Sequence, residues 1–256
     1  MGYETLLLEK QGNVAVLTLN RPPTNSVSYV MLQELDKVFD EVANNMDERV
    51  LVITGSGDRC FSAGMDVADA MSHPDIGDVG RVLWTKLDRF DKPVIAAING
   101  HALGGGCELA LACHFRFMAE NDKAKMGCPE LNLGIIPGWG GTQRMTRLLG
   151  RGKALDLILF SKRLSPQEAL AIGLVDGLYL PEELSLKVME TAQALAQKAP
   201  LAVRAVINAT LVHVDKGIDE GLKAEAEGSN ICAKSKDAIE GFTAFMQKRK
   251  PEFKGE

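Results

Sequence analysis

In the first half of the chain, segments with the hydrophobic pattern of β-strands take turns with segments that have the pattern of α-helices. Residues 5–9 and 14–19 are apolar, β-prone runs on either side of a Gly-Asn turn, and this arrangement predicts a β-hairpin. Apolar residues then recur at helical spacing over 29–44, and a continuously apolar run at 50–54 predicts a buried strand. A strand, a helix and a strand in this order indicate a βαβ unit.

The same order of elements recurs downstream. A predicted helix includes residues 82–90, a buried strand covers 93–98, and a Gly-rich turn leads into a helix from about Gly105. Residues 115–118 could form another strand, and a helix begins at Thr142 after a loop rich in Pro and Gly. A parallel sheet covered by helices is therefore the expected core.

Beyond Gly150 the pattern becomes helical. Ser165 is followed by a proline and then by Glu168, which is the signature of a helix N-terminus, and Gly173 predicts the end of that helix. Further amphipathic periodicity covers 183–199, 201–216 and 221–233. The C-terminal part is thus expected to be helical.

The composition is that of an ordinary globular protein. Hydrophobic residues make up 46% of the 256 positions and charged residues 25%, so the chain can bury a substantial core as one large α/β domain or as one domain with a small appendage. The formal net charge of −5 argues against a general nucleic-acid partner, because such proteins need a basic surface to displace counterions from phosphates.

Cysteine usage and the N-terminal sequence indicate a reducing compartment. The cysteines are odd in number and form no CxxC pair, so neither a disulfide framework nor a metal site is predicted; they are Cys60, Cys107, Cys113, Cys128 and Cys232. The N-terminus has no basic region followed by an apolar one, and no apolar run reaches the roughly 18 residues that a membrane span needs. We therefore expect a cytoplasmic protein without a membrane partner.

Two Gly-rich turns could present backbone N–H groups to a ligand. Three glycines beginning at Gly104 open an apolar helix, where unpaired N–H groups point at one spot, although they can equally form a tight structural turn. The second turn, around Gly64, could present the N–H of Met65 to the same ligand, because open α/β sheets bind ligands at the carboxyl ends of their strands.

Two glutamates lie in or beside such turns. Glu108 lies near the start of an otherwise apolar helix, where an acidic residue is often only a partner for the helix dipole. Glu130 lies among apolar residues between two Gly/Pro turns, where burial would raise its pKa toward the range useful for proton transfer, or where it could simply cap a loop. Two desolvated carboxyls beside backbone donors are the parts needed to polarise a carbonyl and move protons next to it.

The motifs around these positions resemble those of the crotonase, or enoyl-CoA hydratase/isomerase, superfamily, from the first hairpin to the last basic residues. They are Leu19-Asn-Arg-Pro22, Phe61-Ser-Ala-Gly-Met-Asp66, Lys92-Pro-Val-Ile-Ala-Ala97, Asn99-Gly-His-Ala-Leu-Gly-Gly-Gly-Cys-Glu-Leu-Ala110, Pro129-Glu-Leu-Asn-Leu-Gly134, Pro137-Gly-Trp-Gly-Gly-Thr142 and Ala244-Phe-Met-Gln-Lys-Arg-Lys250.

The resemblance implies an α/β fold, a crotonase-like spiral of ββα units that forms two stacked sheets and is followed by a C-terminal helical trimerisation region. Residues 1–195 would then form the core with the acyl-CoA site, and 196–256 the trimerisation region. It also implies an acyl-CoA substrate, no cofactor beyond the coenzyme A thioester of that substrate, and a homotrimer or a homohexamer built as a dimer of trimers.

The resemblance assigns roles to four residues. The thioester oxygen would lie in an oxyanion hole between the N–H groups of Met65 and Gly105. The two glutamates of the family's hydratases match Glu108, which would orient and deprotonate water, and Glu130, which would protonate the α-carbon, although two close carboxyls titrate as a pair. Isomerases of the family generally keep only the second glutamate, so both together favour hydration of a 2-enoyl-CoA to a 3-hydroxyacyl-CoA.

The family binds the adenine of coenzyme A along one strand edge, which corresponds here to Ala63, Asp66 and Val67. Arg59 matches a basic position just before that edge. Lys248 matches a lysine that reaches the 3′-phosphate, often from a neighbouring subunit, but it could equally be a solvated residue at a helix end.

Some positions depart from the common hydratase pattern. His114 stands where Asp is usual and is expected to be structural, Cys128 stands where Gln or Leu is usual, and Met65 stands where straight-chain hydratases mostly have Ala, which leaves the acyl group open. The alternatives are an isomerase that shifts a double bond and a hydratase of a cyclic, aromatic or branched enoyl-CoA. A CoA-binding or RNA-binding protein without activity would have no need for two desolvated glutamates.

Overall fold

The larger of two β-sheets is built around the predicted hairpin. The computed structural model describes residues 2–256. The first two strands pair antiparallel, as predicted, and every later strand of this sheet runs parallel to its neighbour. In spatial order the strands are β1 (Leu6–Gln11), β2 (Val14–Leu19), β3 (Val50–Gly55), β5 (Val94–Ile98), β7 (Phe115–Ala119) and β9 (Gly177–Tyr179).

The smaller sheet has three short parallel strands, β4 (Cys60–Ser62), β6 (His101–Leu103) and β8 (Met126–Gly127). Each of them follows a strand of the large sheet after a short connection. Three consecutive units therefore place one strand in each sheet, and helices complete the units. The predicted α/β fold of ββα units in two sheets is confirmed.

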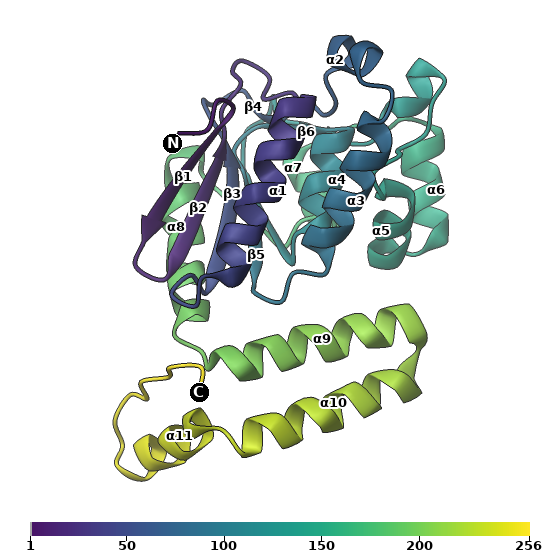
Figure 1. Ribbon diagram of the computed structural model, residues 1–256. Helices are drawn as coiled ribbons and strands as arrows, with labels where there is room; N and C mark the ends of the chain where they lie inside the picture. The colour runs from purple at the N-terminus through teal and green to yellow at the C-terminus, as the bar shows by residue number, and fades with distance from the viewer. Residues whose placement is uncertain (1) are drawn as a thin grey trace.

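Different helices cover the two faces of the large sheet, because successive side chains of a strand point to opposite sides. Leu51 lies in the main core, beneath α1 (Tyr29–Asn44) and α3 (Ile76–Asp88). Its neighbour Val52 packs in a second cluster with α8 (Pro181–Ala196). Figure 1 shows α1 and α3 in front of the strands and α8 behind them.

The predicted helix 29–44 is confirmed with the same bounds. It begins after Ser28, whose hydroxyl accepts a hydrogen bond from the backbone N–H of Met31 at 3.1 Å and so caps the helix. Its buried residues recur every three or four positions, which places them on one face: Met31, Leu32, Leu35, Val38, Phe39 and Val42.

Shorter helices connect the units: α2 (Val67–Ser72), α4 (Gly105–Ala112), the 3-10 helix η1 (Glu130–Leu133), α5 (Gly141–Leu149), α6 (Arg151–Leu159) and α7 (Pro166–Ala171). The predicted start of α7 is confirmed, because Ser165 and Glu168 form a complete capping box. The helix predicted around 82–90 begins earlier, at Ile76, and ends at Asp88.

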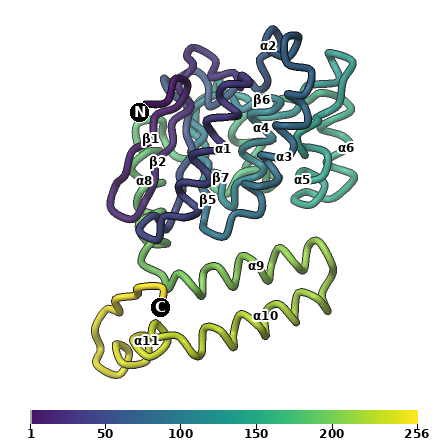
Figure 2. Tube along the Cα trace, in the orientation of Figure 1, coloured from purple at the N-terminus to yellow at the C-terminus, as the bar shows by residue number. Residues whose placement is uncertain are grey.

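The last three helices lie apart from the two sheets (Figures 1 and 2). α9 (Pro200–Lys216) and α10 (Ile218–Ala233) pack closely against each other, and α11 (Lys236–Met246) follows. Gly228 permits the close approach, because a Cβ at that position would lie 2.8 Å from the Cβ of Ala205. The predicted helical C-terminal part is confirmed, while the domain division after residue 195 stays a prediction.

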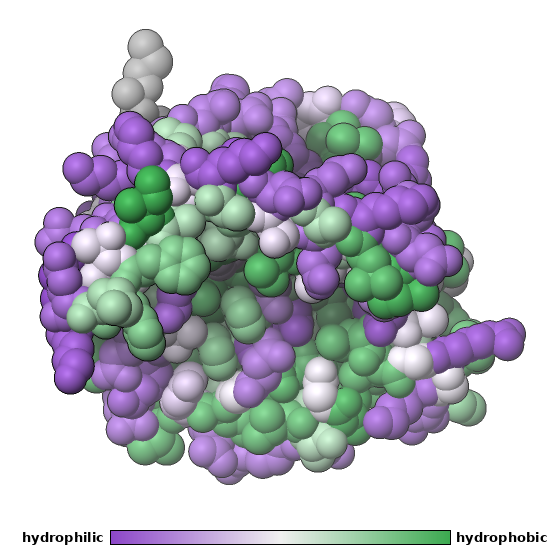
Figure 3. Space-filling view, turned by 90° about the horizontal axis from the view of Figure 1, so that it is seen from below, coloured by the Kyte–Doolittle hydropathy of each residue, from purple (hydrophilic) through white to green (hydrophobic). Residues whose placement is uncertain are grey.

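These three helices expose a broad apolar surface, part of which is visible from below in Figure 3. The exposed apolar residues on them are Val206, Val214, Ile218, Leu222, Ile231, Ile239, Phe242, Phe245 and Met246. Surfaces of this kind usually mark contacts with other molecules. Within residues 2–256, no helix combines the length and the apolar character of a membrane span.

Candidate active site

The candidate site lies at the carboxyl ends of the three strands of the small sheet. The chain leaves β4 toward Met65, β6 toward Gly105 and β8 toward Glu130. Because these strands are parallel neighbours, their carboxyl ends share one edge of the sheet. Residues that are far apart in the sequence therefore meet there, and Glu108 joins them from the first turn of α4.

The backbone nitrogens of Met65 and Gly105 lie close together at this edge. Gly64 has a φ of +92°, and a Cβ on it would lie 2.7 Å from the oxygen of Leu103 and 2.8 Å from the nitrogen of Gly105. A Cβ on Gly105 would in turn lie 3.4 Å from the nitrogen of Met65. Within residues 2–256 neither N–H has a backbone acceptor. Both N–H groups are therefore available to donate to a ligand.

Two tryptophans hold the first turn of α4 in place. The indole N–H of Trp84 donates to the carbonyl of Gly105 at 3.0 Å. The ring of Trp139 covers Gly105 so closely that a Cβ there would lie 2.5 Å from its Cζ3. The two indoles meet edge to face, with centroids 5.3 Å apart, and both are buried. They are core residues that fix the position of the Gly105 peptide.

Glu108 is buried, with only 2% of its surface exposed. Its Oε1 accepts hydrogen bonds from the backbone N–H groups of Trp139 at 2.8 Å and Gly141 at 2.7 Å. Burial raises the pKa of Glu108 to about 7; the charge of Glu130 also raises it, whereas the two hydrogen bonds and Arg144 lower it. A carboxyl with this pKa can take up and release a proton near neutral pH.

Glu130 is the first residue of η1. Its Oε1 lies over Gly104, where a Cβ would be 3.0 Å away, and its buried Oε2 has no hydrogen-bond partner within the described chain. Burial raises the pKa of this carboxyl above its ordinary value. A buried carboxyl oxygen without a protein partner is available to exchange a proton with a bound molecule.

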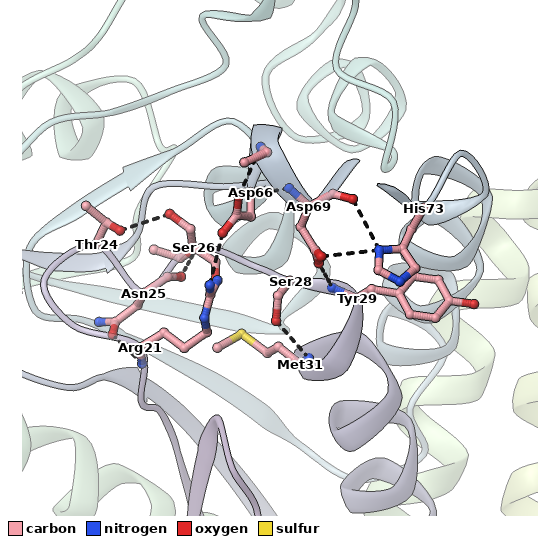
Figure 4. A network of polar contacts seen from close by, with 12 residues as sticks. Arg21, Thr24, Asn25, Ser26, Ser28, Tyr29, Met31, Asp66, Asp69 and His73 are labelled. Atoms are coloured by element: carbon pink, nitrogen blue, oxygen red, sulfur yellow. Dashed lines mark hydrogen bonds and ion pairs between the residues drawn. The ribbon is translucent and has the colours of Figure 1, made fainter. Parts of the chain in front are cut away.

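Asp66, which was predicted to contact adenine, uses its side chain within the protein. Its Oδ1 accepts hydrogen bonds from the N–H groups of Ala68 at 3.1 Å and Asp69 at 3.2 Å, and these bonds cap α2. Its Oδ2 pairs with Arg21 at 3.0 Å (Figure 4). The backbone hydrogen bond from Asp69, together with Arg21, lowers the pKa of Asp66. The backbone N–H of Asp66 also donates to the carbonyl of Val27, at 2.9 Å.

α2 is also tied to the start of α1, as Figure 4 shows. Asp69 accepts a hydrogen bond from the N–H of Tyr29 and lies 3.2 Å from the Nδ1 of His73. The rings of His73 and Tyr29 are stacked, with centroids 4.3 Å apart. Sequence analysis did not predict α2, although an aspartate at the N-cap position was a usable signal.

The remaining predicted coenzyme A contacts fall into two groups. Arg59, Ala63 and Val67 lie around β4, with Arg59 and Val67 exposed and Ala63 half-buried. Lys248 is exposed and follows α11, which lies apart from the two sheets (Figure 1).

Known proteins resemble this chain along almost its whole length. The family described as "Enoyl-CoA hydratase/isomerase" matches residues 9–256. The chain belongs to this family. A crotonyl-CoA hydratase from Syntrophomonas wolfei is 42% identical, with 99% of both chains covered, and a 2,3-dehydroadipyl-CoA hydratase from Escherichia coli is 38% identical, with 98% of both covered. The structure of an enoyl-CoA hydratase from Bacillus anthracis matches with a TM-score of 0.95 at 36% identity, covering 99% of this chain and 100% of that one.

Family membership confirms the resemblance to the crotonase superfamily, and one departure from the family pattern has a clear place in the fold. The Nδ1 of His114 accepts a hydrogen bond from the N–H of Val94 at 2.9 Å, which joins the end of α4 to β5. Burial lowers the pKa of His114 to about 4, so the ring is neutral near neutral pH. This contact supports the expectation that His114 is structural.

Proposed function

We propose that this enzyme is an enoyl-CoA hydratase that adds water across the 2,3 double bond of a 2-enoyl-CoA and yields a 3-hydroxyacyl-CoA. The observation that carries the proposal is that the buried Glu108 and the half-buried Glu130, whose Oε2 is itself buried, lie with two free backbone N–H groups at one edge of the small sheet. The names of full-length relatives at about 40% identity support the same reaction.

The thioester oxygen would accept hydrogen bonds from the N–H groups of Met65 and Gly105. Glu108 takes a proton from water as the water oxygen bonds to the β-carbon, and the electrons of the double bond move toward the thioester oxygen. The two N–H groups stabilise this enolate, which then takes a proton from Glu130 at the α-carbon. A pKa of about 7 suits Glu108 to the first proton transfer near neutral pH. Proton exchange between the glutamates and solvent restores the starting state.

The test is the loss of the enone absorbance of crotonyl-CoA, comparing the wild type with Glu108→Gln, Glu130→Gln and the exposed control Glu9→Gln. We expect each of the first two substitutions to lower kcat by about 10²-fold or more, because each removes a proton-transfer group, and the control to retain activity. Full activity in Glu108→Gln would contradict hydration by two glutamates and favour double-bond isomerisation by Glu130. Turnover of only a cyclic or branched enoyl-CoA would keep the mechanism and change the substrate.

We also propose that the protein is a homotrimer or a dimer of trimers in which α9 to α11 make the contacts. The support is the exposure of large apolar side chains on α11, where Phe242 is 75% exposed and Phe245 is 79% exposed. Light scattering should show a mass of three or six chains, and Phe245→Asp should reduce it. A monomeric wild type would refute this assembly.

The compartment that we propose is the cytoplasm. The support is that all five cysteines are free thiols and that four of them are buried. Stable thiols of this kind fit a reducing compartment.

A further inference from the structure

Arg144 contacts the loop that supplies both hydrogen bonds to Glu108. It lies in α5 and is 5% exposed. Its Nη1 donates to the carbonyl of Trp139 at 2.7 Å, and its Nε lies 3.3 Å from Oδ1 of Asp88, the last residue of α3. The guanidinium therefore lies between the carboxylate of Asp88, with which it forms an ion pair, and the loop.

The conformation of the loop depends on the position of this guanidinium. Gly140 has a φ of +107°, and a Cβ on it would lie 2.1 Å from the Nη1 of Arg144. The carbonyl of Trp139 is directed to Arg144, while the N–H groups of Trp139 and Gly141 are directed to Glu108. Removing the guanidinium would leave the Trp139 carbonyl unpaired and release the segment that orients both N–H groups.

The charges around Glu108 point to an electrostatic consequence as well. Glu130 raises the pKa of Glu108. The pKa of the Cys128 thiol is raised by its hydrogen bond with Cys107 and by burial, and the charges of both glutamates add to this. Arg144 is the positive side chain that lowers the pKa of Glu108. Burial lowers the pKa of Arg144 itself, but a guanidinium begins so far above neutral pH that it keeps its proton.

We propose that Arg144 is a positioning residue for Glu108. It holds the Trp139–Gly141 loop that donates both hydrogen bonds to Glu108, and it supplies a buried positive charge to the surroundings of this carboxyl. This inference rests on the proposed hydratase function. It assigns to Asp88 the role of anchoring the guanidinium from α3. Arg147 also pairs with Asp88 but has no contact with the loop among its hydrogen bonds, which makes it a matched control.

The kinetic test compares Arg144→Met, Arg144→Lys and Arg147→Met in the hydration of crotonyl-CoA across pH. We expect Arg144→Met to lower kcat about 10- to 100-fold near neutral pH with little change in KM, and to move the acid limb of the kcat profile upward by on the order of one pH unit. Arg144→Lys should return the limb toward the wild-type position, because it keeps the charge. Arg147→Met should leave both kcat and the limb unchanged.

A second measurement does not depend on turnover. Isotope-edited infrared titration of labelled glutamate carboxyls, with Glu108→Gln used to identify the Glu108 band, should show that band titrating at higher pH in Arg144→Met than in the wild type. An unchanged Glu108 titration in a folded Arg144→Met protein would overturn the inference, as would equal effects of Arg144→Met and Arg147→Met. A wild type that hydrates no enoyl-CoA would instead refute the proposed function, and the titration would still decide the role of Arg144.

Discussion

Replacing Gly64 with alanine should damage the oxyanion hole without removing either glutamate carboxyl. The added Cβ would lie 2.8 Å from the nitrogen of Gly105 and 2.7 Å from the oxygen of Leu103, distances that side chains do not tolerate. The φ of +92° adds backbone strain, because an L-residue is disfavoured there by roughly 1–2 kcal/mol. The first turn of α4 must move away from Met65, and the two N–H groups can then no longer meet at one oxygen.

The loss of one oxyanion donor typically lowers kcat by about 10²- to 10³-fold, which corresponds to roughly 2.7–4 kcal/mol of transition-state stabilisation. We expect Gly64→Ala to fall in this range in the crotonyl-CoA assay, since the Gly105 N–H would be displaced rather than merely reoriented. The free energy of unfolding should fall by more than the backbone strain alone, because the overlap with Leu103 and Gly105 adds to it.

Gly12→Ala is the matched control. Gly12 also has a positive φ, +62°, but a Cβ there would meet nothing within 4 Å, and the residue lies in the turn between β1 and β2. It should show the strain in its unfolding midpoint while keeping its kcat. If a folded Gly64→Ala protein were as active as Gly12→Ala, the N–H groups of Met65 and Gly105 would not be the donors to the thioester.

Two further predictions concern stability. Glu108 has a pKa of about 7 in the folded protein against an ordinary value of 4.5, so the folded state loses up to about 3 kcal/mol of stability as pH rises from 4.5 through 7. Glu108→Gln should therefore raise the urea midpoint of unfolding at about pH 8 and leave it nearly unchanged at about pH 4. An equal change at both pH values would refute this. His114 has a pKa of about 4 against 6.5, so the unfolded chain takes the proton first and stability falls by up to about 3 kcal/mol as pH drops from 6.5 through 4. His114→Asn can keep an acceptor for Val94 N–H and should show a smaller loss of urea midpoint between about pH 7.5 and 5, and an undiminished loss would contradict the assignment.

The elements with a long periodic pattern could be predicted from the sequence. The helix 29–44 and the strand 14–19 have the predicted bounds, since one face of each is buried over several repeats. β4, β6, β8 and β9 were not predicted, because strands of two or three residues show no periodicity and exist only through their partners. The start of α3 was also missed, and Asp75 before it makes no side-chain cap hydrogen bond.

The site divides in the same way. Glu108, Glu130 and the Gly-rich turns could be selected as candidates from the local sequence, because carboxylates and adjacent glycines in apolar surroundings are uncommon. The hydrogen bonds that hold Glu108 come from the loop after Pro137, and its link to Arg144 and Asp88 joins three helices. Contacts of this range depend on how the helices pack, and no local pattern of residues encodes them.

The small sheet sets the order in which the groups of the site follow one another along its edge. Neighbouring strands of a sheet lie about 4.8 Å apart, and the order β4, β6, β8 sets the order of the groups carried beyond their ends. The first two ends carry the N–H groups that we propose as donors to the thioester oxygen, and the third carries Glu130, an order that suits a molecule whose carbonyl and adjacent carbons lie in a row. Each strand end continues into a separate turn. The residue after the third strand can therefore be exchanged, which would change the reaction at the carbon atoms, without moving the N–H groups that bind the carbonyl oxygen.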